Sequence, residues 1–247
     1  MVKLFNYADK NYNEIEFRKL MQRELKRYKK DSRICAVVKN VEGDRVLDVG
    51  CHVGILSRFL AEQGKEVIAI DILESVIETA KIFNQVKGVI YKQGDIFDLK
   101  FKENEFDSIL FLETIEHVNN PSNFLQEYFR ILKPGGSLII STPNALSYIN
   151  ILQNVPFLFR KKREAFIEFL RTEPRNTGTQ LDHIFSWDFK TLLRYIVRFG
   201  FEYSSHEFAG AYTFSALGGR ELKFIIPILN PFLTTIVLKV NKPCIQK

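Results

Sequence analysis

The sequence predicts an α/β domain in which helices cover both faces of a mostly parallel, doubly wound sheet of seven strands. Three observations carry this prediction. Short apolar segments rich in Val, Ile and Leu alternate with amphipathic segments of helical length along most of the chain. The apolar segments are nearly continuous, which is typical of strands buried on both faces of a parallel sheet. Glycine and proline mark the ends of many segments.

The first part of the chain predicts one helix and then an alternation of strands and helices. Residues 14–39 form the helix, with apolar positions among many lysines and arginines. The strands that follow are predicted over residues 45–50, 66–71, 88–95, 106–112 and 137–143. The helices are predicted over residues 54–64, 74–84 and 121–132, and a Lys-Pro-Gly-Gly turn over 133–136.

The pattern breaks after Pro143 and resumes near Trp187. The intervening polar and basic stretches predict an inserted cap rather than an independent domain. A helix over 187–199 and strands over 201–208 and 234–240 then complete a Rossmann-like sheet with an antiparallel edge strand. We therefore expect one domain over 1–247, with a helical segment (1–43), a ligand-binding core (44–143), the cap (144–185) and a C-terminal part (186–247).

Composition is that of an ordinary soluble protein, with 46% hydrophobic and 26% charged residues. The formal net charge of +6 indicates acidic partners such as phosphates, nucleic acid or anionic lipid, without choosing among them. Cys35, Cys51 and Cys244 form no C-x-x-C pair, which argues against a disulfide framework or zinc ribbon. The N-terminus has no signal-peptide pattern, and two prolines interrupt the apolar segment 224–240. We expect a cytoplasmic protein.

Glycines and acidic residues follow the first three predicted strands. In open α/β sheets, ligands bind beyond the carboxyl ends of the strands. The loop LDVGCHVG, residues 47–54, lets the backbone approach a ligand closely, and the next helix points its N–H groups there. Asp71 ends the second strand about 20 residues on, where a carboxylate can accept hydrogen bonds from ribose hydroxyls. Asp95 follows the third strand, placed to reach the edge of an adenine ring.

The fourth strand runs into three groups that can bind protons or metal. In FDSILFLETIEHVNNP, Glu113, Glu116 and His117 are spaced i, i+3 and i+4, on one face of any helix that begins there. Two carboxylates and an imidazole could bind a divalent cation. Two other interpretations stay open: a metal-free catalytic role with His117 as general base, and a purely structural role, because acidic residues stabilise the first turn of a helix.

Five segments, in order, resemble the motifs of class I S-adenosylmethionine-dependent methyltransferases. They are VLDVGCHVG, VIAID, QGD, FDSILFLETIEHV and LKPGGSLIISTPN, which together cover about residues 44–145, with weaker similarity to about residue 203. The resemblance implies S-adenosylmethionine as cofactor, with Asp71 on its ribose and Asp95 and Ile96 on its adenine. The full set of cofactor contacts that it implies is Asp48, Gly50, Cys51, His52, Gly54, Asp71, Ile72, Asp95, Ile96 and Leu112.

One position departs from the family pattern. His52 stands where the loop D-x-G-C-G-x-G of the family has its middle glycine. If this position needs a positive φ, histidine adopts it only with some strain, and its side chain would narrow the pocket. A tolerated substitution and a weakened cofactor site both remain open. A dinucleotide-binding dehydrogenase is a competing interpretation of the glycine loop, but the LKPGG and E-x-x-E-H segments argue against it.

The E-x-x-E-H segment resembles that of two methyltransferase groups, the ubiquinone-biosynthesis O-methyltransferases and the small-RNA 3′-terminal 2′-O-methyltransferases. In both groups this motif is linked to a divalent metal beside the acceptor hydroxyls. The small-RNA enzymes add a histidine from a D-H-x-F-x-W segment, and this chain has DHIFSW with His183. The resemblance implies Mg²⁺ or Mn²⁺ on Glu113, Glu116, His117 and His183, with catalytic roles for His117, Glu116 and His183.

The leading hypothesis is an O-methyltransferase for a small-molecule or lipid-like hydroxyl. The alternatives are an RNA 2′-O-methyltransferase and a non-catalytic protein that keeps the fold. Residues 148–159 of the cap are apolar and could line an acceptor pocket or form the cap's own core. The basic segment 160–164 could meet phosphate or make peripheral contact with a membrane. The sequence leaves the acceptor and the oligomeric state open.

Overall fold

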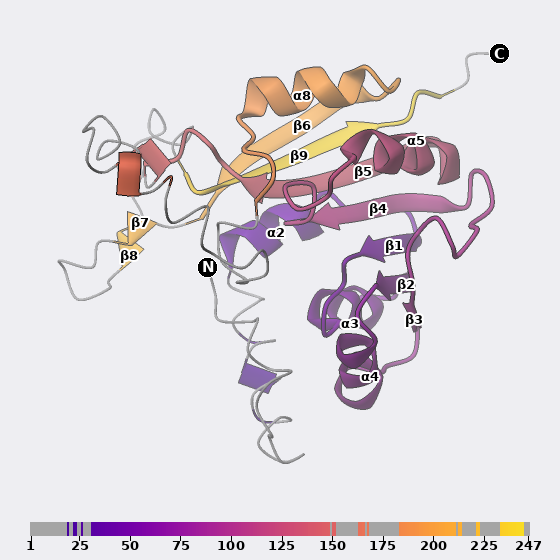
Figure 1. Cartoon of the computed structure of the whole chain (residues 1–247). Coiled ribbons are helices and arrows are strands. Elements are labelled where there is room, and N and C mark those ends of the chain that lie inside the picture. The colour runs from indigo at the N-terminus through magenta and orange to yellow at the C-terminus, as the bar shows by residue number, and fades with distance from the viewer. Residues whose placement is uncertain are drawn as a thin grey trace.

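A computed structural model describes residues 31–148, 150–151, 183–210 and 233–244, with short pieces at 19, 22–23, 26, 163–165, 167, 212–213 and 221–222. Its main sheet has seven strands in the order β3-β2-β1-β4-β5-β9-β6 (Figure 1). Most of the predicted cap lies outside the described residues, as does most of its basic segment, so the predictions for these parts stay predictions.

The strands of the main sheet are apolar and largely buried, as their composition predicts. Five run parallel: β1 (Arg45–Val49), β2 (Glu66–Asp71), β3 (Val89–Gln93), β4 (Phe106–Leu112) and β5 (Leu132–Pro143). β9 (Thr235–Asn241) runs antiparallel between β5 and the edge strand β6 (Glu202–Ala209). A small separate sheet pairs β7 (Tyr212–Thr213) with β8 (Glu221–Leu222). The predicted, mostly parallel α/β sheet with antiparallel pairing at one edge is therefore confirmed.

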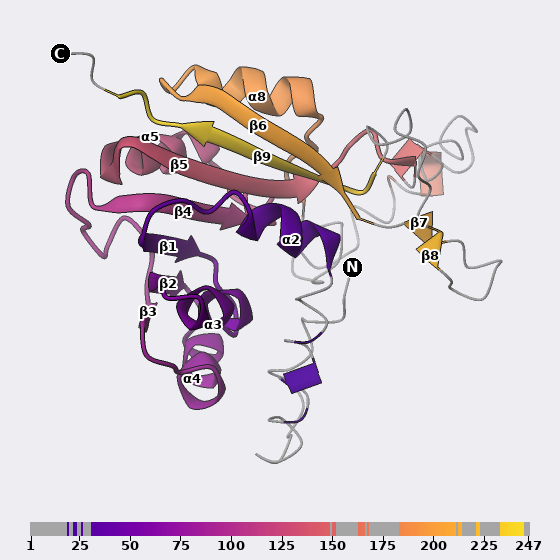
Figure 2. The ribbon, with the colours of Figure 1, turned by 180° about the vertical axis from the view of Figure 1, so that it is seen from behind.

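Helices cover the two faces of the sheet (Figures 1 and 2). They bury one apolar core on each face. One face carries α2 (Ser32–Val38), α3 (Ile55–Glu62) and α4 (Glu74–Phe83), and the other carries α5 (Pro121–Ile131) and α8 (Phe189–Val197). The helices are amphipathic, so each turns its apolar stripe toward the strands. None of the described helices is long and apolar enough to cross a membrane.

The N-terminal helix is interrupted where the sequence predicted continuity. Asp31 has an extended backbone, and its carboxylate accepts a hydrogen bond from the backbone N–H of Arg33 at 2.8 Å. The Arg33 guanidinium pairs with the same carboxylate at 2.9 Å. The prediction of one helix over 14–39 is wrong at this point, because the local cap of Asp31 starts a new helix at Ser32.

The predicted turn at 133–136 is a bulge inside β5. Phe106 of β4 pairs with Leu132, and Ser108 pairs with Ser137, so β5 carries extra residues at this point. The bulge is hydrogen-bonded to Lys242, just after β9, through Gly135 N–H and Gly136 C=O. The glycines allow the turn-like backbone that the sequence indicated. Pairing with β4 and hydrogen bonds to Lys242 nevertheless make the segment part of the strand.

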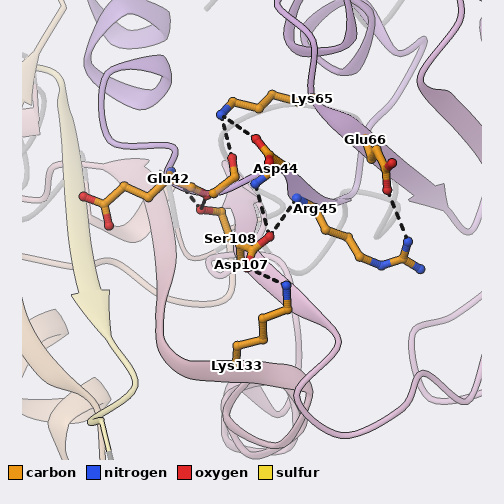
Figure 3. Close-up of polar contacts among 9 residues, drawn as sticks. Glu42, Asp44, Arg45, Lys65, Glu66, Asp107, Ser108 and Lys133 are labelled. Atoms are coloured by element: carbon orange, nitrogen blue, oxygen red, sulfur yellow. Dashed lines mark hydrogen bonds and ion pairs between the residues drawn. The ribbon is translucent and has the colours of Figure 1, made fainter.

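A polar network fixes the chain at the start of β1 and β4 (Figure 3). The Asp107 carboxylate accepts hydrogen bonds from the backbone N–H groups of Asp44 and Arg45 at 3.1 and 2.9 Å, and from Lys133 Nζ at 2.6 Å. Ser108 Oγ accepts from Glu42 N–H at 3.0 Å and donates to Glu42 C=O at 2.7 Å. These bonds set β1 beside β4, and thereby align the opposite ends of the two strands.

We predict that Gly43→Ala destabilises the fold far more than Gly64→Ala. Both glycines have positive φ, +66° and +89°, which costs a side chain about 1–2 kcal/mol. A methyl group at Gly43 would also lie 2.3 Å from Asp107 Cβ, whereas nothing lies within 4 Å of one at Gly64. Overpacking adds about 1–3 kcal/mol at Gly43. Urea unfolding of both variants measures the difference, and equal losses would contradict this account of the network.

Candidate functional site

The carboxyl ends of the parallel strands surround a cavity of about 440 Å³, a size that fits one cofactor-sized molecule. The order of strands reverses between β1 and β4, the position at which open α/β sheets bind ligands. The cavity is lined by Val49, Gly50, Ile70, Asp71, Ile72, Gly94, Asp95, Ile96, Phe97, Thr114, His117, Val118, Asn119, Asn120, Asn123 and Phe124.

The glycine loop after β1 is held in left-handed conformations. Gly50 and Gly54 both have a φ of +75°. A side chain at Gly54 would meet the ring of Tyr91, whose hydroxyl hydrogen-bonds the Gly54 carbonyl at 3.0 Å. Gly54 thus needs both its conformational freedom and its lack of a side chain. Gly50 lines the cavity, so bare backbone faces any ligand there.

His52 also adopts a positive φ, +51°, as the family's glycine pattern led us to expect. Its backbone N–H donates to Asp71 Oδ2 at 2.9 Å, so this conformation links the loop to the end of β2. Burial lowers the pKa of the imidazole, although the charge of Asp71 opposes this. His52 is not among the residues that line the cavity, and its effect on the pocket stays a prediction.

Two aspartates lie beside the loop, one in the wall of the cavity and one buried beneath the loop. Asp71 lines the cavity, and backbone N–H groups of His52 and Leu73 bind its two oxygens at 2.9 and 3.0 Å, which fixes its orientation. Asp48 is buried beneath the loop and accepts a hydrogen bond from Ser57 Oγ at 2.6 Å. Burial raises the pKa of Asp48 to about 6, against the Ser57 bond, and the charge of Asp71 adds to the rise.

The predicted cofactor residues divide into two groups. The lining of the cavity includes Gly50, Asp71, Ile72, Asp95 and Ile96. The others lie in or next to the loop and strand ends without lining it: Asp48, Cys51, His52, Gly54 and Leu112. The sequence analysis did not single out several lining residues: Phe97, Thr114, Asn119, Asn120, Asn123 and Phe124. They follow β3 or β4 or lie in the first turn of α5, and that position was the available signal.

The E-x-x-E-H segment is a turn, and the helix considered for it is absent. Glu113 has a φ of +48°, and α5 starts only at Pro121. Glu113 N–H donates to the Ser141 carbonyl at 2.8 Å, and its carboxylate accepts from Ser141 Oγ at 2.8 Å. These bonds to the end of β5 override the helical spacing. Although Glu113 is exposed at the surface, desolvation raises the pKa of its carboxylate, with the Ser141 bond opposing.

Three of the four predicted metal ligands come together. Ligand atoms of Glu116, His117 and His183 lie within 4.8 Å of one another, and the two imidazole rings meet edge to face with centroids 4.7 Å apart. Backbone N–H groups of Ile184 and Phe185 donate to the Glu116 carbonyl at 2.7 and 3.2 Å, which brings His183 to this position. Glu113 is not part of this group within the described residues.

Glu116 is the buried member of this cluster, with 1% of its surface exposed. Its Oε2 accepts from Thr142 Oγ1 at 3.0 Å, while its Oε1 has no hydrogen-bond partner among the described residues. Burial raises the pKa of Glu116 to about 8, and the charge of Glu113 adds to the effect. A buried carboxylate with one free oxygen favours a proton or a cation nearby. His117 lines the cavity and so connects it to the cluster.

Residues 47–140 match the family described as a methyltransferase domain. A ubiquinone biosynthesis O-methyltransferase of Pseudomonas fluorescens is 38% identical over 108 residues, which is 42% of this chain and 47% of that protein. One of Xanthomonas euvesicatoria is 31% identical over 156 residues, 58% of this chain and 65% of that protein. The resemblance to this class of methyltransferases is confirmed.

Solved methyltransferases share the fold. An S-adenosylmethionine-dependent methyltransferase from Mesorhizobium loti has a TM-score of 0.55 at 17% identity, covering 82% of this chain and 92% of that one. Another from Archaeoglobus fulgidus has a TM-score of 0.56 at 19% identity, covering 91% and 94%. The matches span between 42% and 65% of the length of these and other curated relatives.

We predict that Asp48→Asn removes part of the pH dependence of stability. Folded Asp48 keeps its proton up to about pH 6, whereas the unfolded carboxyl loses it near 3.8. The stability that this group contributes is therefore present below pH 3.8 and lost as pH rises through 6. Relative to wild type, the free energy of unfolding of Asp48→Asn should rise by roughly 2–3 kcal/mol between pH 4 and 7.5.

Urea unfolding of both proteins across this range measures the difference. The matched control is Asp98→Asn, at an exposed aspartate, for which the difference from wild type should stay flat. A pH-independent difference for Asp48→Asn as well would show that the buried carboxyl is not the source.

Proposed function

We propose that this chain is an S-adenosylmethionine-dependent methyltransferase that acts on a hydroxyl group of a small-molecule or lipid-like acceptor. One observation carries the proposal: His117 belongs both to the wall of the cavity and to the cluster with Glu116 and His183. A proton acceptor is therefore available where a cofactor and a second substrate would meet. The relatives named as ubiquinone biosynthesis O-methyltransferases support an oxygen acceptor.

The cavity suits S-adenosylmethionine in size and chemistry. Ile72, Ile96 and Phe97 offer apolar surface for the faces of an adenine ring. Asp71 can accept hydrogen bonds from the ribose hydroxyls, and Gly50 lets the methionine portion approach the backbone. When bound, the cofactor supplies an electrophilic methyl group on its sulfonium.

The residues of the cluster would prepare the acceptor for in-line transfer. The acceptor oxygen must be aligned with the methyl group and lose its proton. A ring nitrogen of His117 would take this proton, since a neutral imidazole is a suitable base near pH 7. The edge-to-face contact with His183 orients the ring, and the Glu116 carboxyl, with its raised pKa, lies beside both imidazoles.

The same three side chains fit a divalent cation. The free Oε1 of Glu116 and the two imidazoles form a compact donor set with room for other ligands from water or substrate. Two nitrogen donors favour Mn²⁺ over Mg²⁺, which prefers oxygen. When bound, such a cation supplies a Lewis acid that lowers the pKa of an acceptor hydroxyl. Glu113, the fourth predicted ligand, accepts a hydrogen bond from Ser141 and lies outside this donor set in the described residues.

An RNA 2′-O-methyltransferase would use the same cluster and remains the alternative. It requires a continuous basic track with steeply salt-dependent binding. The basic segments that could supply it fall mostly outside the described residues, whereas the names of the relatives favour a small acceptor. Peripheral membrane contact and a cytoplasmic location stay predictions of the sequence.

We predict that S-adenosylhomocysteine binds the purified protein with micromolar affinity, measured by calorimetry with Mn²⁺, with Mg²⁺ and with EDTA. If a cation occupies the cluster, direct titration of Mn²⁺ should show one site per chain, and Glu116→Gln should weaken it at least about tenfold. Absence of nucleoside binding under all conditions would contradict the methyltransferase proposal. Absence of a Mn²⁺ site, with cofactor binding intact, would leave the metal-free base mechanism.

We predict that the double variant Glu116→Ala, His117→Ala abolishes methyl transfer to an acceptor hydroxyl while keeping S-adenosylhomocysteine affinity within about fivefold. The reason is that the cluster faces the acceptor, while the glycine loop and Asp71 hold the cofactor. Transfer from labelled cofactor and calorimetric affinity are measured in parallel. Glu78→Ala, at an exposed residue of α4, is the control and should behave as wild type. Normal turnover in the double variant would remove the cluster from the mechanism.

A further inference from the structure

We propose that Asn123 binds the exocyclic amine of the cofactor's adenine, so that Asp95 and Asn123 each accept one of its two N–H groups. The inference rests on the proposed function, because it needs the cofactor in the cavity. It adds a specificity-determining residue from α5, outside the glycine loop and the ends of β2 and β3. A residue of this helix would then help the protein to distinguish adenine from bases that lack the exocyclic amine.

Two segments build one end of the cavity. Residues 94–97 follow β3, and residues 119–124 lead into α5 and form its first turn. The rings of Phe97 and Phe124 meet edge to face with centroids 5.0 Å apart. Asn123 directly precedes Phe124 and lines the same cavity. The start of α5 and the segment after β3 are therefore adjacent walls.

A second contact fixes the helix along the same segment. Tyr128, one turn after Phe124, is fully buried, and its ring meets that of Phe111 on β4 at 5.1 Å. The Tyr128 ring also packs against that of Phe124, with centroids 6.2 Å apart. Asn123 thus projects from a helix that is anchored on β4 and on the segment after β3.

The direction of a bound nucleoside follows from the order of the strands. Asp71, the ribose-binding candidate, ends β2, which lies between β1 and β3. With the methionine portion at the loop after β1, the base extends toward the end of β3. Ile72 and Ile96 then cover its faces, and its polar edge points to Asp95 and Asn123.

The chemistry of the two side chains matches this edge. One oxygen of Asp95 accepts the Phe97 N–H at 3.1 Å, which leaves the other for a donor in the cavity. No described residue hydrogen-bonds the Asn123 amide, whereas the Asn120 oxygen is taken by the Ser122 hydroxyl. Asparagine can accept from the adenine amine and donate to an adjacent ring nitrogen, a pairing that hydroxyls and aliphatic side chains cannot make.

The test compares two ligands on matched proteins by calorimetry. The ligands are S-adenosylhomocysteine and its purine-riboside analogue, which lacks the 6-amino group. The proteins are wild type, Asn123→Ala, Asn123→Asp and Gln126→Ala, the last an exposed residue of α5 that does not line the cavity. Since both hydrogen-bond acceptors use the amine, the analogue removes their partner without adding a new group.

We expect Asn123→Ala to weaken S-adenosylhomocysteine about tenfold and the analogue by less than about threefold, so that the preference for the amine falls. Asn123→Asp keeps an acceptor oxygen and should retain the preference. Gln126→Ala should match wild type for both ligands.

Two results would overturn the inference while leaving the proposed function intact. One is an unchanged preference in Asn123→Ala, and the other is an equal loss of both ligands, which would mean that Asn123 only shapes the cavity. Failure of wild type to bind S-adenosylhomocysteine at all would overturn the proposed function together with the inference. Full retention of the preference in Asn123→Asp, with its loss in Asn123→Ala, supports it.

Discussion

The hydrogen bonds between the glycine loop and the end of β2 are the constraint on which the site depends. Gly50 and Cys51 donate their N–H groups to the Ile70 carbonyl at 2.9 and 3.0 Å, and His52 donates to the Asp71 carboxylate. The loop must turn left-handed to make them, which explains positive φ values at Gly50 and His52. The same bonds orient Asp71, so one backbone arrangement both opens the cavity and positions its acid.

Buried carboxylates show that parts of the site work against stability. Asp48 and Glu116 are both nearly inaccessible to solvent, and burial raises both pKa values. Hydrophobic residues of similar size could be buried at these two positions at a lower cost in folding free energy. Each acid instead keeps one hydroxyl partner, Ser57 or Thr142, and sits next to a group with a proposed role in binding or catalysis. Such conflicts between local environment and residue type are typical of functional sites.

The cofactor side of the site could be predicted from the sequence because its signals are local. A glycine loop, an acid at the end of β2 and Asp95 after β3 lie where the alternation of strands and helices puts them. The sequence also indicated His183, but through a family resemblance, since no local pattern reveals that residues 184 and 185 bind the Glu116 carbonyl.

The errors have the opposite origin. Periodicity around Glu113 allowed a helix, yet bonds to Ser141 impose a left-handed turn. Capping by Asp31 split a predicted helix, and the Lys-Pro-Gly-Gly segment became a bulge through contact with Lys242. In each case, partners distant in the chain or a single side-chain bond outweighed a pattern read over several residues. The lining role of Asn123 was missed for the same reason.

The placement of β9 has a consequence for how the protein is made. β9 lies between β5 and β6, and among the described strands β6 has no other neighbour in the main sheet. During synthesis, the residues of β5 therefore emerge with one edge unpaired, and β6 and α8 wait for residues 235–241 to leave the ribosome. An unpaired strand edge is a template for association with other chains. The nascent chain therefore exposes this edge of β5 until residues 235–241 pair with it.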